Sequence, residues 1–298
     1  MKYPLYIVDV FAEAKYEGNQ LAVVLDEVGL ETEMMQKIAR EMHFSETTFI
    51  TGYDLKKKTF KVRIFTPESE LPFAGHPTLG TAYIAQKELL KEKVEKLTLE
   101  MKAGLIPVQI YYEGGEPDVL WMKQLNPVFG ETHPVEAFAE MLGLTPEDFD
   151  TEYPIQEVST GVYFYMVPLK TRAALKRVKV DVEKLTEYSK GKKAGWPFMF
   201  CREPDDPSNH IKARMIGSWE DQATGSANGC LTGYLVKHRY FGDSKIDVRV
   251  EQGAEINRPS ILYLKGEEKE DEISVEVGGK VAYVAKGELV YVDVKSTE

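Results

Sequence analysis

The stretch "ELPFAGHPTLGTAYIA" (residues 70–85) places a glycine, a histidine and a proline directly before a run of small and apolar residues. This run predicts a helix that opens near Gly75, with His76 in its first turn and an acidic loop ahead of it. The start of a helix presents N–H groups without partners and a partial positive charge, and glycine lets a ligand approach that backbone closely. The stretch therefore predicts either a site for a small anion or a tight turn that carries a surface histidine.

A second stretch, "EDQATGSANGCLTGYLV" (residues 220–236), repeats this pattern, and its Gly225 follows Gly75 by 150 residues. Each copy comes after a predicted strand and an acidic loop, and each leads through its glycine into a helix of small residues. A single copy would be weak evidence, whereas two copies in equivalent positions indicate a pseudo-twofold protein with a site where its halves meet. We expect the halves to be residues 1–128 and 129–279, with the last strand, 280–298, packing back onto the first half.

The composition is that of a globular protein, and 298 residues allow two domains of ordinary size. A net charge of −11 argues against nucleic acid or an anionic membrane as the main partner, although a local pocket can still bind a small anion. Neither the two cysteines nor the histidines show a metal-binding spacing, so no metal site is expected. The start reads as a strand rather than a signal peptide, and no apolar run spans a membrane, so we expect a cytoplasmic protein.

Three local patterns give expectations that the structure can test. Apolar residues with helical spacing predict a helix within "ETEMMQKIAREMH" (31–43), followed by a strand that begins near Thr47. The segment "EVSTGVYFYMVPL" (157–169) is rich in β-branched and aromatic residues and predicts one strand. A loop over 218–229 is expected to precede a helix over 231–241.

The segment "FSETTF" (44–49) places Glu46 where the predicted helix gives way to a strand. Between Phe44 and Phe49 a carboxylate would be partly desolvated, which raises its pKa towards neutrality. Such a group can take a proton from carbon and return it elsewhere, with Ser45 and Thr47 orienting it. Read in isolation, the same residue is better explained as a capping or salt-bridged glutamate.

His76 and Asn19 add polar groups that suit the same chemistry. A helix start disfavours the protonated imidazole and so lowers the pKa of His76, leaving a neutral acid/base group. Asn19 lies between a glycine and a buried strand, where its amide either binds a polar group of a substrate or closes an Asx-type turn.

In the second copy, Asp221 precedes Ser226 by five residues. The carboxylate of Asp221 can therefore stand at the edge of the loop while Thr224, Gly225 and Ser226 face the same ligand. Two such helix starts facing each other would hold a carboxylate without an arginine.

Taken together, these motifs resemble the PhzF-like phenazine-biosynthesis isomerase family, within the diaminopimelate-epimerase-like superfamily. The resemblance covers nearly the whole chain and depends on the combination of F-S-E-T, A-G-H-P-T and D-x-A-T-G-S-A. The matching stretches, in order, are "DVFAEAKYEGNQLAVVL", "MQKIAREMHFSETTFI", "IFTPESELPFAGHPTLGTA", "EDQATGSANGCLTGYL", "EQGAEINRPS" and "VGGKVAYVAKGEL".

The resemblance implies an α+β fold of the α/β roll type, with two pseudo-symmetric halves that each wrap a curved mixed sheet around a central helix. It also implies an active site in the cleft between the halves, a homodimer, and no cofactor. In the family's phenazine enzyme, the residue matching Glu46 shuttles a proton within a dihydro-hydroxyanthranilate ring, assisted by those matching His76 and Asp221. Residues near the substrate match Asn19, Ser45, Gly75, Gly225 and Ser226.

The chain also departs from the family pattern. The resemblance leads us to expect proline after Asn19 and after Asp221, where this chain has Gln20 and Gln222. Amino-acid racemases of the superfamily use one cysteine at each helix start. Here His76 and small polar residues occupy those places, and Cys230 lies about a turn inside its helix, which argues against a two-thiol racemase.

The sequence therefore predicts a cofactor-independent isomerase that moves a proton on a small cyclic or amino-acid-like carboxylic acid, with Glu46 as the shuttle. One alternative is an epimerase or racemase that uses Glu46 and either Asp221 or His76 on opposite faces of an amino-acid derivative. Another is a binding protein that keeps the site but turns nothing over. The natural substrate is left open, because analogy of fold does not select it.

Overall fold

The computed structural model describes residues 2–290, which form two compact units. Within the described residues, the first unit contains 2–122 and 279–290, and the second contains Lys123–Gly278. The sequence had placed these divisions at 128/129 and 279/280. Strand β18 (Val281–Val290) pairs antiparallel with β1 (Lys2–Val10), and the rest of the predicted last strand, 291–298, lies outside the described residues.

The first unit is built on a mixed sheet in the order β18-β1-β2-β3-β4-β6-β7-β8. Its pairs β2–β3 and β4–β6 are parallel, and the other neighbours are antiparallel. The short β5 pairs with the end of β4 and leads into the helix that follows. The strands between β1 and β18 are β2 (Asn19–Leu25), β3 (Glu46–Asp54), β4 (Thr59–Phe65), β5 (Glu70–Leu71), β6 (Lys96–Met101), β7 (Gly104–Glu113) and β8 (Glu116–Lys123).

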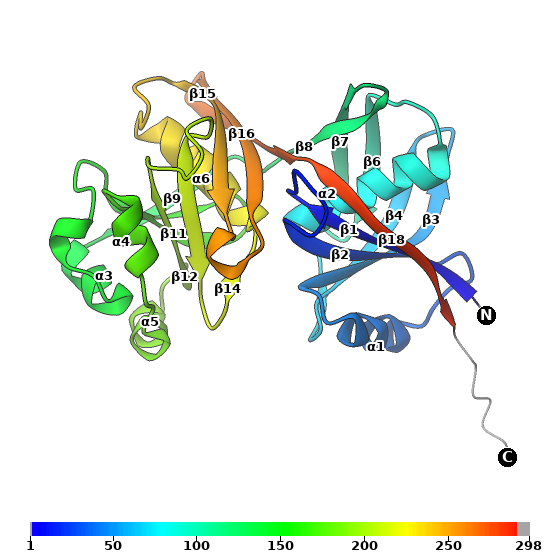
Figure 1. Cartoon of the computed structure of the whole chain (residues 1–298), viewed down its shortest axis with the longest axis horizontal. Coiled ribbons are helices and arrows are strands. Elements are labelled where there is room, and N and C mark those ends of the chain that lie inside the picture. Colours follow the sequence, from blue (N-terminus) through cyan, green and yellow to red (C-terminus); the bar gives the residue numbers. More distant parts are fainter. Residues whose placement is uncertain (1, 291–298) are drawn as a thin grey trace, which may run out of the picture. The chain divides into compact units, whose positions relative to one another are not determined.

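Helix α2 (Gly75–Ile84) is buried along its whole length and packs against the strands of its own unit (Figure 1). A π-helical segment, Ala85–Leu90, continues it. Gly80 allows the close approach, because a Cβ there would lie 2.6 Å from Leu21 Cδ2 and 2.8 Å from Val10 Cγ2. The hydroxyls of Thr48 in β3 and Thr81 in α2 are 2.8 Å apart. Tertiary packing, rather than helix propensity, therefore holds this helix in place.

Helix α1 (Thr32–Met42) covers a different apolar face of the first unit. It ends at His43, whose φ of 56° is left-handed and whose N–H bonds to Ala39. The predicted helix over 31–43 is thus confirmed. The core beneath it consists of Tyr3, Val24, Leu30, Met35, Ala39, Phe49 and Phe65.

The second unit repeats the pairing plan of the first, in the order β9-β10-β11-β12-β13-β15-β16-β17. Its parallel pairs, β11–β12 and β13–β15, fall at the same places in this order, and β14 is the counterpart of β5. The repeat inferred from the two glycine-containing stretches is therefore present in the strand pairing. The strands are β9 (Val128–His133), β10 (Ile155–Ser159), β11 (Tyr163–Pro168), β12 (Trp196–Cys201), β13 (Ile211–Ile216), β14 (Glu220–Asp221), β15 (Lys245–Gln252), β16 (Ser260–Lys269) and β17 (Glu272–Gly279).

Helix α6 (Gly225–Lys237) is the counterpart of α2 and lies against the strands of the second unit (Figure 1). The other side of this sheet carries a second apolar core, which includes Phe138, Tyr165, Leu175, Leu185 and Met199. The helices over that core are α3 (Val135–Leu142), α4 (Arg172–Arg177) and α5 (Val182–Ser189). The unit also contains two 3₁₀ turns, η2 (Pro146–Asp148) after α3 and η3 (Ala254–Ile256) between β15 and β16. No helix in the described part of the chain is long and apolar enough to cross a membrane.

Two local predictions need correction. The single strand expected over 157–169 is an antiparallel pair, β10 and β11, that turns at Gly161, whose φ is 135°. The helix expected from Leu231 begins at Gly225, so Ser226 lies in its first turn. Its small residues are poor helix formers, but they let the helix pack closely: a Cβ at Gly233 would lie 2.6 Å from Pro127.

Candidate active site

The predicted site residues fall into two groups, one in each unit. In the first unit, Glu46 opens strand β3 and is the register partner of Leu21 on β2. Thr48, two residues further, contacts helix α2, so alternation along the strand directs Glu46 to the α2 face as well. The Glu46 side chain is 17% exposed. Phe49 lies on the opposite face, against α1, so the expected flanking of Glu46 by this ring is wrong.

His76 is the second residue of α2, and its side chain is 7% exposed. Its Nε2 lies 3.4 Å from Oε2 of Glu46, which brings the two predicted catalytic groups together. Burial lowers the pKa of His76 to about 3, although a hydrogen bond with the Gln20 backbone acts in the opposite direction. The imidazole is therefore neutral at ordinary pH, as the sequence predicted, with burial as the main cause.

The start of α2 offers backbone donors at the same place. Ala74, the residue before the helix, is extended, and no described side chain caps the helix start. Thr78 donates its hydroxyl to the Ala74 carbonyl at 2.7 Å, and Gly75 is buried. A helix start of this kind binds anions through its first N–H groups.

Asn19 and Ser45 complete the first group. Asn19 opens β2, is 1% exposed, and lies two residues before Leu21, whose side chain faces α2. The loop before it needs glycine at Gly18, whose φ is 67° and whose Cβ would lie 2.3 Å from the Val10 carbonyl. Ser45 is half-buried beside Glu46. The sheet register and α2 thus gather the first-unit residues where β2, β3 and α2 begin.

The second group surrounds the start of α6. Asp221 ends the short strand β14, and its Oδ2 accepts a hydrogen bond from Thr224 Oγ1 at 2.7 Å. Thr224 directly precedes Gly225, the first helical residue, and no side-chain cap is found there among the described residues. Ser226, in the first turn, is half-buried. Asp221, Thr224, Gly225 and Ser226 therefore lie together, as predicted.

Two organising residues were missed by sequence reasoning. Gln252, at the end of β15 and 1% exposed, accepts from the Thr224 N–H at 3.1 Å and donates to the Asp221 carbonyl at 3.0 Å. Asn228 donates to the Thr224 carbonyl at 3.0 Å and to Gln252 at 3.2 Å. A polar residue at the end of a strand carries no local signal for such a role.

One glutamate before each helix, Glu70 or Glu220, is ion-paired rather than directed at a ligand. Arg63 binds both oxygens of Glu70 at 2.8 Å, and Arg214 binds those of Glu220 at 2.8 and 2.7 Å. Arg63 holds the pKa of Glu70 at about 2. Each pair clips a two-residue strand to its long neighbour just ahead of a helix start.

At both departures from the family pattern, the backbone of the glutamine contacts a neighbouring residue. The His76 ring forms a hydrogen bond with the Gln20 backbone. The Gln222 carbonyl packs so closely against Gly253 that a Cβ there would lie 2.4 Å from its oxygen. Proline lacks the backbone N–H but keeps its carbonyl, so a proline at position 20 or 222 would still present that carbonyl.

Cys201 and Cys230 are both buried thiols. Burial raises the pKa of Cys230 to about 12, so this residue is poorly suited to act as a base. Among residues 2–290, no group of three or more His, Cys, Asp or Glu side chains is arranged to hold a metal ion.

Comparison with known proteins agrees with this arrangement. The family model described as "Phenazine biosynthesis-like protein" matches residues 8–287. The trans-2,3-dihydro-3-hydroxyanthranilate isomerase of Pseudomonas aeruginosa is 34% identical, over 94% of this chain and 97% of its own length. The crystal structure of a PhzF-family phenazine biosynthesis protein from Bacillus anthracis superposes with a TM-score of 0.88 at 29% identity, covering 98% of this chain and 100% of that one.

A more distant likeness concerns the fold alone. A probable proline racemase from Agrobacterium radiobacter matches with a TM-score of 0.64 at 11% identity, over 99% of this chain and 94% of that one. The predicted α+β fold with two similar halves is confirmed.

The fold and the sequence relationships define an isomerase. The chain belongs to the phenazine biosynthesis-like family, also called the PhzF family.

Proposed function

We propose that this isomerase moves a proton between two carbon atoms of a small cyclic or amino-acid-like carboxylic acid, with Glu46 as the group that carries the proton. The observation that supports this most is the 3.4 Å approach of Glu46 Oε2 to His76 Nε2 at the start of a buried helix. A carboxylate that is largely shielded from water and held next to a neutral imidazole suits general acid/base catalysis.

The proposed reaction needs one carboxyl group for both proton steps. The Glu46 carboxylate takes a proton from a carbon next to a double bond, and the electron pair left behind shifts that double bond. The protonated Glu46 then returns the proton to the carbon at the other end of the shifted system. Nothing is oxidised or reduced, so the reaction as proposed calls for no cofactor.

His76 has a supporting role in this scheme. A neutral imidazole donates from one ring nitrogen and accepts at the other. We propose that Nε2 accepts a hydrogen bond from Glu46 while that residue carries the proton. The bond between the ring and the Gln20 backbone keeps the ring orientation fixed.

The substrate carboxylate would be held by backbone donors rather than by an arginine. The starts of α2 and α6 both lack a capping side chain among the described residues. We propose that Asp221 and the α6 start take part in the same turnover as Glu46 and His76. Relatives include an enzyme named for trans-2,3-dihydro-3-hydroxyanthranilate, which makes this compound the first substrate to test.

The test is incubation in heavy water with trans-2,3-dihydro-3-hydroxyanthranilate and a panel of unsaturated cyclic acids and amino acids, followed by NMR. We expect one of these acids to be converted into an isomer with a shifted double bond. The receiving carbon carries deuterium to the extent that the proton on Glu46 exchanges with water before it is returned. Deuterium at an inverted stereocentre, with no shifted double bond, would instead indicate an epimerase. A protein that is stabilised against melting by one of these acids but converts none would be a binding protein, and the proposal would be wrong.

A further inference from the structure

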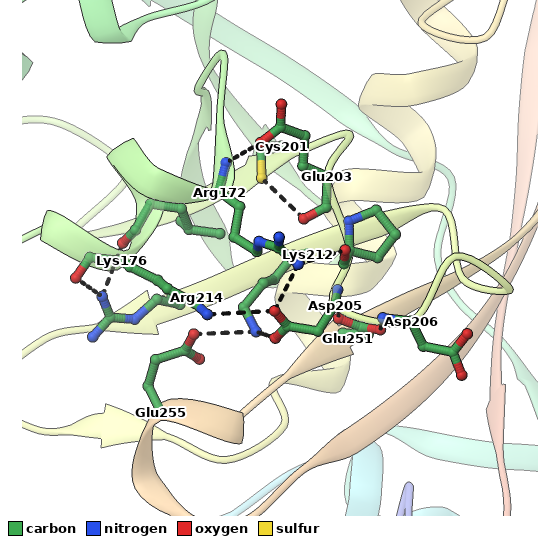
Figure 2. Close-up of polar contacts among 12 residues, drawn as sticks. Arg172, Lys176, Cys201, Glu203, Asp205, Asp206, Lys212, Arg214, Glu251 and Glu255 are labelled. Atoms are coloured by element: carbon green, nitrogen blue, oxygen red, sulfur yellow. Dashed lines mark hydrogen bonds and ion pairs between the residues drawn. The ribbon is translucent and has the colours of Figure 1, made fainter.

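Lys212, on β13, is a charged residue with no exposed side-chain surface, and it lies outside the residues assigned to the reaction. Its Nζ pairs with Asp205 and lies 3.1 Å from Oε1 of Glu255, as Figure 2 shows. Its register partner on β15 is Glu251, which accepts hydrogen bonds from the backbone N–H groups of Asp205 and Asp206 at 2.6 and 2.8 Å. Lys212 is thus buried among carboxylates that pair with it or with the neighbouring backbone.

Burying a lysine in this way contributes little to stability. Removal of the ammonium from water costs several kcal/mol, which a good ion pair approximately offsets. Burial alone lowers the pKa of Lys212, but the hydrogen bond to Asp205 and the charge of Glu255 outweigh it and raise the pKa. The side chain therefore stays charged, and its main effect is to fix the position of the carboxylates that it contacts.

One of those carboxylates belongs to a turn that contacts the second group of site residues. Glu255 lies in the 3₁₀ turn η3, which closes on the carbonyl of Gly253 through the N–H groups of Ile256 and Arg258, at 3.2 and 3.0 Å. Gly253 has a φ of 79°, and a Cβ there would lie 2.4 Å from the Gln222 carbonyl. A displacement of Glu255 would therefore move the backbone that supports the Asp221–Thr224 loop.

Gln252 provides the last link, because it directly precedes Gly253 in the chain. Its side chain accepts from the Thr224 N–H and donates to both the Asp221 carbonyl and Thr224 Oγ1. The path from Lys212 to the start of α6 thus passes through Glu255, the Gly253 turn and the Gln252 amide.

The internal repeat shows that this arrangement is particular to the second unit. Arg214, two residues after Lys212, has its counterpart in Arg63, since both arginines form bidentate pairs with the glutamate of a short strand. The residue two before Arg63 is Lys61, and it is exposed. The arginine clip is common to both units, whereas the buried lysine is found at this position only in the second.

We propose that Lys212 is a positioning residue of the candidate active site. Through Glu255, Lys212 holds Gln252 and Gly253 in position. These two residues in turn fix the conformation of the Asp221–Thr224 loop and of the start of α6. This inference rests on the proposed function, because it takes the α6 start to bind the anionic group of the substrate.

Two matched variants test the proposal, because Lys212 has one carboxylate partner on the path and one away from it. Glu255→Gln removes the negative charge of the partner that lies on the path to the loop. Asp205→Asn removes the negative charge of the other partner of Lys212. We expect backbone amide exchange over residues 221–228 to be about tenfold faster in Glu255→Gln and close to wild type in Asp205→Asn. Glu255→Asp, which keeps the charge but retracts it by one methylene, is the second variant and should give a smaller increase.

Kinetics with the acid that the wild-type enzyme converts separate positioning from general destabilisation. Helix-start donors hold the carboxylate in both the ground state and the transition state. Because Asp221 lies in the same loop, Glu255→Gln should raise KM about tenfold and also lower kcat, and Asp205→Asn should change neither. Equal amide exchange over 221–228 in the two variants would overturn the proposal. Faster exchange with an unchanged KM would leave the positioning intact and refute the role of the α6 start in the proposed function.

Discussion

Oε2 of Glu46 and Nε2 of His76 lie 3.4 Å apart, although thirty residues separate them in the chain. The register of β3 places the carboxylate on the α2 face, and the burial of α2 brings the imidazole to it. The pair is therefore a product of the sheet and its central helix rather than of a loop. A position set by packed secondary structure suits a proton-carrying group, because small displacements of such a group strongly reduce the reaction rate.

The lowered pKa of His76 predicts how stability depends on pH. Its pKa is about 3 when folded and about 6.5 when unfolded, so between these values the unfolded chain binds a proton that the folded chain does not. The free energy of unfolding should therefore rise with pH across this window through His76, and fall as the pH is lowered. Urea unfolding from pH 4 to 7 should show a shallower pH dependence in His76→Asn than in the wild type. Equal slopes would contradict the burial of a neutral imidazole.

Asp221→Asn tests whether the charge of this residue contributes to turnover. Asparagine can still accept the bond from Thr224 Oγ1, so the loop should stay in place while the charge is lost. We expect kcat/KM to fall about 100-fold, in the range of an assisting acid/base group, with an unchanged melting temperature. The control is Asp247→Asn, which removes a charge from a side chain that is 69% exposed. Equal kinetics in the two variants would exclude Asp221 from the reaction.

Gly80→Ala tests the packing of α2 against the sheet. The added methyl group would lie 2.6 Å from Leu21 Cδ2, so side chains or backbone must shift, and we expect a loss of about 1–3 kcal/mol in the free energy of unfolding. Gly52→Ala is the matched control, since its Cβ would meet nothing closer than Lys61 Cδ at 3.8 Å. Denaturant unfolding of both variants measures the difference, and a control that loses as much as Gly80→Ala would contradict this packing.

The proposed reaction predicts that activity needs no metal ion or organic cofactor. Protein that has been dialysed against EDTA and passed over a desalting column should retain its activity within experimental error. Restoration of lost activity by Mg²⁺, Zn²⁺ or a concentrated low-molecular-mass extract would show that the carboxyl-only scheme is incomplete.

Much of this arrangement could be predicted from the sequence, because its signals are local. The two glycines 150 residues apart mark the starts of α2 and α6, and the repeated strand pairing follows from that symmetry. Alternation along β3 could also have corrected one error. Glu46 and Phe49 are three residues apart and so must face opposite sides of a strand.

The rest depends on contacts between distant segments. Gln252 follows Asp221 by 31 residues, and nothing in its neighbourhood shows that its amide would hold that loop. Lys212 and Lys61 occupy equivalent positions in similar strands, yet one is buried and the other exposed, because only one of them is covered by neighbouring segments. A homodimer and a cytoplasmic location stay predictions of the sequence.

The most direct test of the central claim is conversion of the preferred acid in heavy water by wild-type protein and by Glu46→Gln. The substitution keeps the shape of the side chain but removes its ability to carry a proton. We predict isomerised product from the wild type, deuterated only where the proton on Glu46 exchanges with water, and a rate at least about 1,000-fold lower in Glu46→Gln, with an unchanged melting temperature. Turnover by Glu46→Gln at the wild-type rate would show that another group moves the proton, and would contradict the account.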